Sequence, residues 1–503
     1  MAIDLSKATT GERALGVASV IFGLFAATTI GLSLRYGTMV NYGSGVWLTL
    51  ATDTVSGIFY RPLISTVGIG GTRYFPLNFL LIAAVIRIGV APIAAGHVIA
   101  LASGTALVVG IYRLLRDLDV ERRLALVSAS LVLCSYSAIF ALGTIRGDIA
   151  PAALNVWGLV FAARLLRDPR TLRAEIACAS CFGLAFLAKP TTLFGLAATC
   201  TTLFLKGSRH RLGAWRLLVL TVAGVVVLLA AANAASDGRM LESLVADATA
   251  GGGIRGLVSG PWRFLYAAVR QDPLSITLFV MFSAGLVTLP PSGWRDLTTW
   301  AGVFTLLAMG LIYGTPGVDF NHLIDFYAVG LVFVIVPIAR GRLPSQSAGT
   351  AIAISAILSM AMLGSEFRRM REYGDVTRLP EVARQVREMD NEGKPLFAQN
   401  PLIPILNGTR PFLLDPWMFR MLGRNDARLR QSLNEKVREQ FFAVVVLGGF
   451  SEGFSADPRT VSGQSFFADW YGSDFLPTLF ANYELTSSLP PYFIYRRRQD
   501  HPR

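Results

Sequence analysis

The chain has 503 residues, of which 53% are hydrophobic and only 16% are charged. Together with a mean hydropathy of +0.50, this composition excludes a water-soluble globule and indicates a polytopic membrane protein. The net charge of +13 would suggest nucleic acid as the partner of a soluble protein, but much of the positive excess lies in short loops between apolar runs. We therefore expect no nucleic-acid binding.

The apolar runs begin near residue 14 and end near residue 364. The longer runs suffice to cross about 30 Å of hydrocarbon at a rise of ~1.5 Å per residue. The first run, residues 14 to 34, is too long for a signal-peptide core and is predicted to be a retained anchor. The sequence thus predicts a transmembrane domain over residues 1–364 and a soluble α/β domain over residues 365–503.

Basic residues gather in alternate gaps between the apolar runs, and such gaps are expected on the cytosolic side. These gaps are Arg113 to Arg123, Arg164 to Arg173, Lys206 to Arg216, Arg295, and Arg340 to Arg342. Counting from them leaves no full span for residues 75 to 90, which we predict to form a short helix in the outer interface. We expect about eleven crossings, a cytosolic N-terminus and a periplasmic C-terminal domain in a bacterial inner membrane.

This topology places ionisable and polar residues at the outer ends of spans: Asp148, Lys189 and the Asn321-His322 pair. Charged side chains near lipid are costly unless they are paired or functional, so these positions mark a candidate site. Structural alternatives stay open at two of them. Asp148 precedes Ile149-Ala150-Pro151 and could cap a helix, whereas Lys189 could reach water by snorkelling.

The first outer loop, residues 35 to 74, is longer than a simple connector and carries both apolar and charged residues. It includes a predicted interfacial helix with apolar residues on one side, namely Trp47, Leu48, Leu50 and Val55. Asp53 is the only carboxylate of this loop, which also carries three arginines, Arg35, Arg61 and Arg73. The planar guanidinium group of arginine can donate two hydrogen bonds to phosphate oxygens, so the loop could hold a lipid phosphate. The alternative is that the arginines only anchor the loop to anionic headgroups.

Neither a metal nor a cofactor is expected. Cys178 and Cys181 form a CxxC pair within an apolar span, without His or further Cys nearby, and are predicted to be packing residues. The chain has only four His, and the outer residues offer no dense set of carboxylates.

The tail beyond residue 364 is predicted to be an α/β layer. We expect helices over residues 381–389 and 428–440, and strands over residues 395–399, 411–414, 442–447, 483–488 and 492–496. No glycine-rich phosphate loop or nucleophile motif occurs in this tail.

In this order the elements resemble the GT-C superfamily of glycosyltransferases, which includes protein mannosyltransferases and aminoarabinose transferases. The resemblance rests on A-x-x-x-x-x-G-x-x-Y-R-P at Ala51 to Pro62, R-Y-F-P-L at Arg73 to Leu77, R-G-D at Arg146 to Asp148, and Lys189-Pro190. It covers residues 10 to 340, and the tail looks like the small extramembrane domain of many bacterial members. It implies a polytopic helical fold with interfacial helices in the first outer loop.

The resemblance also implies an activity. Such an enzyme moves a sugar, hexosyl or pentosyl, from a polyprenyl-phosphate donor to an outer-leaflet lipid, glycan or protein acceptor, in contact with membrane lipids. Acid–base work is implied for Asp148 and Asp53. Donor binding is implied for the outer cations and their neighbours Arg61, Arg73, Tyr74, Arg146 and Lys189. Asn321 and His322 would hold sugar hydroxyls or phosphate, and Asp325 would orient the His322 ring.

The chain departs from the GT-C pattern at one position. Members carry a principal acid soon after the first helix, whereas this chain has Asn41-Tyr42-Gly43-Ser44-Gly45 there. This gap leaves open a catalytically silent relative that binds lipid carriers. A lipid or glycan transporter is the other alternative, because cavities lined by membrane-embedded charge also serve translocation. The absence of an internal repeat weighs against the transporter.

Overall fold

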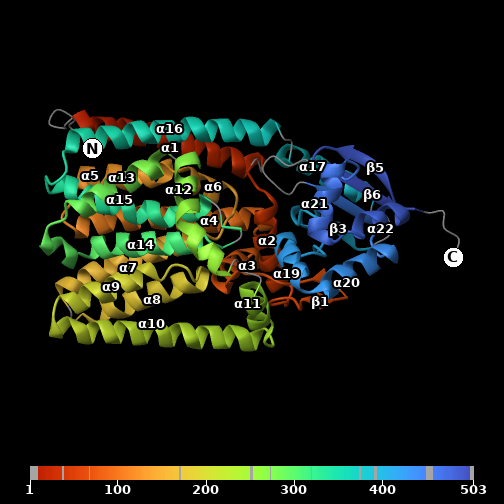
Figure 1. Ribbon diagram of the computed structural model, residues 1–503, viewed down its shortest axis with the longest axis horizontal. Helices are drawn as coiled ribbons and strands as arrows, with labels where there is room; N and C mark the ends of the chain where they lie inside the picture. Colours follow the sequence, from red (N-terminus) through yellow and green to blue (C-terminus); the bar gives the residue numbers. More distant parts are fainter. Residues whose placement is uncertain are drawn as a thin grey trace.

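The computed structural model describes residues 10–498 apart from short gaps at 37–38, 67, 169–170, 250–252, 272, 316, 319, 373–374, 390–393 and 449–456. A bundle of long helices runs along the long axis, and a smaller part that contains a sheet lies at one end of it (Figure 1). The N-terminus is at the far end of the bundle, and the C-terminus is at the tip of the sheet-containing part (Figure 1).

The bundle is built from helices of mainly apolar sequence, which satisfy their backbone hydrogen bonds internally as a membrane requires. In chain order they are α1 (Thr10–Tyr36), α4 (Pro92–Asp117), α5 (Arg122–Ser130), η1 (Leu131–Cys134), α6 (Tyr136–Gly143), α7 (Ile149–Arg167), α8 (Leu172–Ala188), α9 (Phe194–Leu205), α10 (Ser208–Ala235), α12 (Gly253–Gln271), α13 (Pro273–Val287), η2 (Pro291–Arg295), α14 (Leu297–Ile312), η3 (Phe320–His322), α15 (Leu323–Ala339) and α16 (Ser345–Glu372). The short α11 (Arg239–Thr249) lies beside the end of α10.

Among the described residues three helices, α4, α7 and α10, are long and apolar enough to cross a membrane by length and composition. The pair Arg122–Cys134 and Tyr136–Gly143, bent by 65°, makes a fourth if it is one broken span. Six shorter apolar helices accompany them, including α9, α13, α14 and α15. The predicted number of about eleven crossings therefore stays a prediction.

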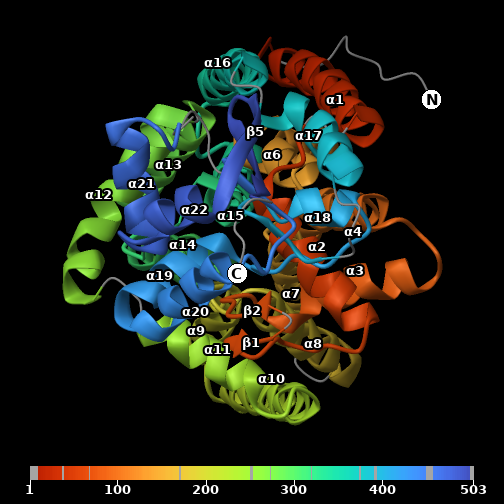
Figure 2. The same cartoon turned by 90° about the vertical axis from the view of Figure 1, so that its right-hand side faces the viewer.

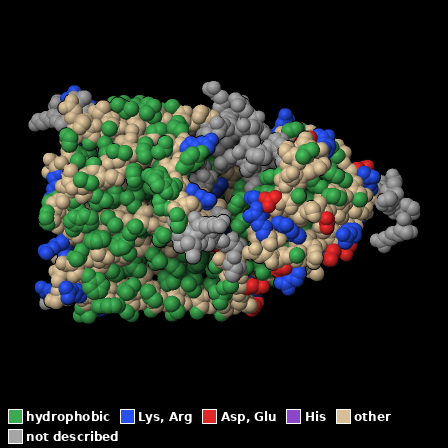
Figure 3. All heavy atoms as spheres, viewed as in Figure 1, with side chains coloured by type: hydrophobic (Ala, Val, Ile, Leu, Met, Phe, Trp, Pro, Cys, Tyr) green, Lys and Arg blue, Asp and Glu red, His purple; other side chains and the backbone are tan. Residues whose placement is uncertain are grey.

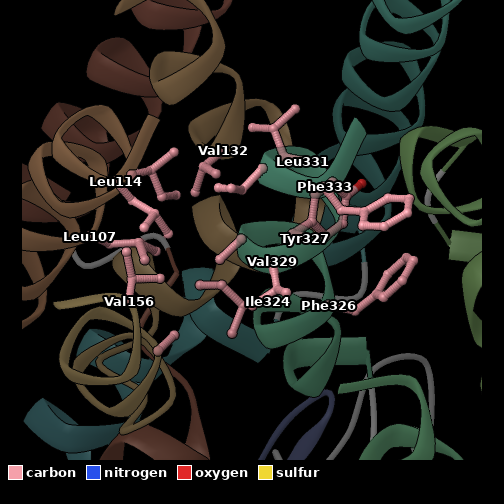
Figure 4. Close-up of a cluster of buried hydrophobic side chains, with 14 of the residues drawn as sticks. Leu107, Leu114, Val132, Val156, Ile324, Phe326, Tyr327, Val329, Leu331 and Phe333 are labelled. Atoms are coloured by element: carbon pink, nitrogen blue, oxygen red, sulfur yellow. The ribbon is translucent and has the colours of Figure 1, made fainter. Parts of the chain in front are cut away.

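The surface and the core of the bundle differ as expected for a protein in lipid. Hydrophobic side chains cover most of its visible face, and Lys and Arg side chains gather at the end away from the sheet-containing part (Figure 3). Inside, α15 is buried along its whole length from Leu323 to Val336, which fits its apolar composition on all sides. Its side chains, among them Ile324 and Val329, pack against Leu107 and Val156 (Figure 4). The first turn of α15 is thus rigidly held.

The first outer loop contains α2 (Tyr42–Val55), β1 (Ile64–Ser65), β2 (Gly68–Ile69) and α3 (Pro76–Arg87). Asn41 and Ser44 form a reciprocal capping box that starts α2. The short helix predicted within residues 75 to 90 is confirmed as α3, which has Pro76 in its first turn. The predicted helix around Trp47 is also present, as α2. It is buried on more than one side, since both Trp47 and Asp53 are buried.

The C-terminal part, residues 375–498, was predicted from the sequence to be a soluble domain and keeps that name below. It contains a four-stranded sheet in the order β3-β4-β6-β5, where β3 and β4 are parallel and the other pairs antiparallel. Its elements are α17 (Asp375–Met389), β3 (Leu396–Ala398), α18 (Leu402–Leu406), α19 (Pro416–Asn425), α20 (Ala427–Arg438), β4 (Val444–Gly448), α21 (Val461–Tyr471), α22 (Phe475–Asn482), β5 (Tyr483–Leu489) and β6 (Tyr492–Arg497).

Most of the secondary structure predicted for the tail agrees with these elements, with one error. The strand predicted over residues 411–414 is wrong, because only Leu413 makes an isolated bridge, and its partner is Ile69 of the first outer loop. In addition, α16 continues to Glu372, past the predicted domain boundary at residue 364. The helix crosses this boundary because no proline follows the apolar run before Glu372.

The soluble domain is docked on the first outer loop. The Ile69 N–H donates to Phe412 O at 2.8 Å, and the Leu414 N–H donates to Ile69 O at 3.1 Å. Viewed along the long axis, the domain covers the end of the bundle, with α18 beside α2 (Figure 2). Elements far apart in the sequence therefore meet at this end.

Candidate functional site

Three charged side chains from separate helices meet at the end of the bundle. Lys189, the C-cap of α8, lies with Nζ 3.1 Å from Asp148 Oδ1 and 3.3 Å from Asp325 Oδ2. Asp148 immediately precedes α7, and Asp325 is in the first turn of α15. All three are buried, and removing Lys189 would leave two carboxylates without their shared cation in a poorly solvated place. The predicted convergence of Asp148 and Lys189 is therefore observed.

The turn before α15 completes this cluster. Asn321 Nδ2 donates a 2.7 Å hydrogen bond to Asp148 Oδ2, so both oxygens of that carboxylate are occupied. His322 lies next to Asn321, and its Nδ1 is buried without a hydrogen-bond partner among the described residues. The expectation that Asp325 orients the His322 ring is wrong, because Asp325 uses Oδ2 for Lys189 and leaves Oδ1 unpaired in the described part of the chain.

The loop residues of the cluster have displaced pKa values. Burial alone would raise the pKa of Asp148, but the Lys189 charge, the Asn321 hydrogen bond and the Arg146 charge together lower it to about 2. Burial and the neighbouring Lys189 ammonium lower the pKa of His322 to about 3. Asp148 is thus ionised and His322 neutral at physiological pH.

Arg146 brings a further cation to the loop before α7. Its guanidinium carbon lies 5.0 Å from the centre of the Phe140 ring. It also lies close to α2, since a Cβ placed on Gly43 would be 3.4 Å from the same carbon. The acid-free stretch Asn41–Gly45 therefore borders the site.

Arg73 and Tyr74 extend the site toward the soluble domain. The guanidinium carbon of Arg73 lies 5.6 Å from the centre of the Tyr74 ring, which lies 4.1 Å from the Trp47 ring. Gly317 packs against Arg73 so tightly that a Cβ there would be 2.7 Å from Arg73 Nη1 and 2.9 Å from Trp417 Nε1. Arg73 thus lies where the outer loop, the segment before α15 and α19 meet.

The structure places Asp53 and Arg61 in a separate cluster. Arg61 Nε and Nη2 donate to the Asp53 carboxylate at 2.5 and 2.9 Å, and Arg61 Nη1 donates to Pro411 O at 2.6 Å. Arg410 Nε lies 3.2 Å from Asp53 Oδ1. Asp53 and Arg61 therefore join the first outer loop to the soluble domain, and the structure does not bring them into the cluster around Lys189.

Two residues at the site were missed by the sequence reasoning, Asp415 and Trp417. Asp415 accepts hydrogen bonds from the backbone N–H groups of Trp417 and Met418 and so caps α19. The pattern Asp-Pro at 415 and 416 is a helix start signal that was present in the sequence. This local pattern does not indicate that the helix starts beside Arg73.

No protein-family model matches this sequence, and no curated protein does. Among solved structures, the chain is similar to ArnT from Cupriavidus metallidurans bound to undecaprenyl phosphate, with a TM-score of 0.60 at 12% identity over 96% of this chain and 99% of that one. This chain shares the fold of ArnT.

A second solved structure supports the same conclusion about the fold. The oligosaccharyltransferase AglB from Archaeoglobus fulgidus, in complex with an inhibitory peptide and a dolichol-phosphate, has a TM-score of 0.56 at 11% identity over 99% of this chain and 75% of that one. At these identities the likeness concerns the fold, so the activity has to be argued from the site.

Proposed function

We propose that this chain is a membrane glycosyltransferase that moves a sugar from a polyprenyl-phosphate donor to a lipid, glycan or protein acceptor on the outer leaflet. The observation that carries the proposal is the buried cluster of Lys189, Asp148, Asp325 and Asn321 at the bundle end covered by the soluble domain. Buried charge at a membrane boundary is retained where it serves a function. The GT-C fold favours transfer over transport as that function.

The donor phosphate would be held by the three cations of the site, Lys189, Arg73 and Arg146. As the sugar leaves, negative charge develops on the phosphate, and fixed cations in a poorly solvated site stabilise it at small reorganisation cost. Arg73 and Arg146 offer planar forks, whereas Lys189 is a compact charge. His322, being neutral, can hydrogen-bond a sugar hydroxyl or a phosphate oxygen without adding charge.

For the two carboxylates predicted to do acid–base work, we propose positioning roles instead. Asp148 has both oxygens occupied and a lowered pKa, so it is a weak base that holds Lys189 and Asn321 in place. Asp53 is bound by Arg61 and Arg410 and fixes the outer loop to the soluble domain.

Purified protein in detergent, given a polyprenyl-phosphate hexose, tests the proposal. We expect release of the free polyprenyl phosphate at a rate that depends on an added acceptor. A transporter would instead move the donor across vesicle membranes without cleaving it. A silent relative would bind the donor and release nothing, and either of these two outcomes would reject the proposed transferase.

A further inference from the structure

The soluble domain carries a buried carboxylate beside the site. Asp415 is 2% exposed. One of its oxygens, Oδ1, accepts both capping hydrogen bonds, from the Trp417 N–H at 3.0 Å and the Met418 N–H at 3.2 Å. Within the described residues Oδ2 has no hydrogen bond or ion pair. Capping α19 therefore occupies only Oδ1 of Asp415 and leaves Oδ2 available to accept a hydrogen bond or a proton from another group.

The fold brings Asp415 to the cations of the site. The hydrogen bond from the Leu414 N–H to Ile69 O, 3.1 Å long, holds the start of α19 against the outer loop that carries Arg73. Trp417, two residues beyond Asp415, shares with Arg73 the tight contact at Gly317. On the face seen in Figure 3, Lys and Arg side chains lie where the bundle meets the soluble domain.

The electrostatic setting of Asp415 makes it a stronger base than an ordinary aspartate. Burial raises the pKa of Asp415, and so does Asp247 of α11, whereas Arg73 and the two capping hydrogen bonds oppose the rise. Two phenols, Tyr42 of α2 and Tyr74, lie near enough to it that its charge helps to raise the pKa of each. A carboxylate with a raised pKa takes a proton more readily, in contrast to Asp148.

We propose that Asp415 Oδ2 is the general base that removes the proton from the acceptor hydroxyl, an inference that rests on the proposed transferase function. The hydroxyl O–H bond breaks and its proton moves to Oδ2. The oxygen electron pair forms the new bond to the anomeric carbon of the sugar. The bond between that carbon and the phosphate oxygen breaks, and the phosphate leaves with its electron pair beside Arg73 and Lys189.

Comparison of two nucleophiles tests this assignment. Methanol must lose a proton to attack the sugar, whereas azide is already an anion and needs no base. The probe is a polyprenyl-phosphate hexose with a labelled sugar, and the products are the methyl glycoside and the glycosyl azide. Asp415→Asn keeps the cap, because Asn is as good an N-cap as Asp. Asp426→Asn, which alters the exposed cap of α20, is the matched control.

We expect Asp415→Asn to slow transfer to methanol by about 100-fold or more while leaving transfer to azide within roughly twofold of wild type. The Asp426→Asn control should behave as wild type with both nucleophiles. Equal losses with methanol and azide would show that Asp415 only positions its neighbours, and an unchanged methanol rate would show that it has no role. Wild-type protein that transfers sugar to neither nucleophile would overturn the transferase function itself, together with this inference.

Discussion

Lys189 Nζ lies 3.1 Å from Asp148 Oδ1, although the two residues cap different helices and are 41 positions apart in the chain. Asp325 joins them from α15 at 3.3 Å. A lysine between two buried carboxylates is costly to desolvate, and it persists because the rigid ends of α7, α8 and α15 fix all three groups. This chain thus presents a preformed charged site at one end of its bundle.

Replacing Asp148 by Asn should lower sugar transfer roughly 100-fold, a size typical for loss of one group that organises transition-state electrostatics. Lys189 would keep Asp325 as its partner, so the protein should still fold. Transfer rates with saturating donor measure the effect. Asp117→Asn, which removes a partly exposed carboxylate paired with Arg164 at the end of α4, is the control and should leave the rate unchanged.

Replacing Arg61 by Met should destabilise the protein by about 3–5 kcal/mol, because it leaves the buried Asp53 carboxylate without its bidentate partner. Thermal unfolding of the purified protein would show a lower midpoint, and limited proteolysis would cut the soluble domain from the bundle faster. Arg428→Met breaks an exposed pair with Asp426 and serves as the control. An unfolding midpoint equal to that of wild type would contradict the docking role of this pair.

Replacing Gly317 by Ala should weaken donor binding, because the residue has φ +78° and a Cβ would collide with Arg73 and Trp417. Gly341 has φ +67° and open space where its Cβ would lie, so Gly341→Ala imposes similar backbone strain without a collision. We expect a raised KM for the donor in Gly317→Ala and a KM near wild type in Gly341→Ala. Equal effects of the two variants would mean that strain alone matters.

Stability should fall as the pH falls from about 7 to 5, because His322 stays neutral in the folded protein, with a pKa of about 3, whereas it takes up a proton when unfolded. The sign follows from proton binding, since acid favours the state that binds more protons. Asp148 affects stability only at lower pH, because its contribution to the free energy of unfolding is lost as the pH falls through about 2. Unfolding midpoints across this range should drop less in His322→Gln than in wild type.

Much of the fold was predictable because it depends on patterns along the chain. Apolar length indicated the membrane helices, and Pro76 with Pro92 indicated the short α3 between breaks. The convergence of Asp148 with Lys189 followed from topology, since both were expected at the outer ends of spans. These predictions succeeded because hydrophobic periodicity and helix start signals are local.

Other features could not be predicted because they depend on contacts between distant segments. Asp53 was a reasonable candidate base until the structure paired it with Arg410, which lies in another domain. Asp325 was expected to orient His322, one helical turn away, but its side chain reaches Lys189 of α8 instead. The proximity of Asp415 to Arg73 arises from the docking of the soluble domain, which no local pattern encodes.

The most direct test of the account measures polyprenyl phosphate released from a polyprenyl-phosphate hexose by purified protein. Wild type is compared with Lys189→Gln/Asp325→Asn, which removes one cation and one anion from the cluster, and with Lys206→Gln at an exposed site. We predict release by wild type and by Lys206→Gln at similar rates, and a loss of about 100-fold or more in the double variant. Release by the double variant at the wild-type rate would contradict the assignment of the Lys189 cluster as the site of sugar transfer.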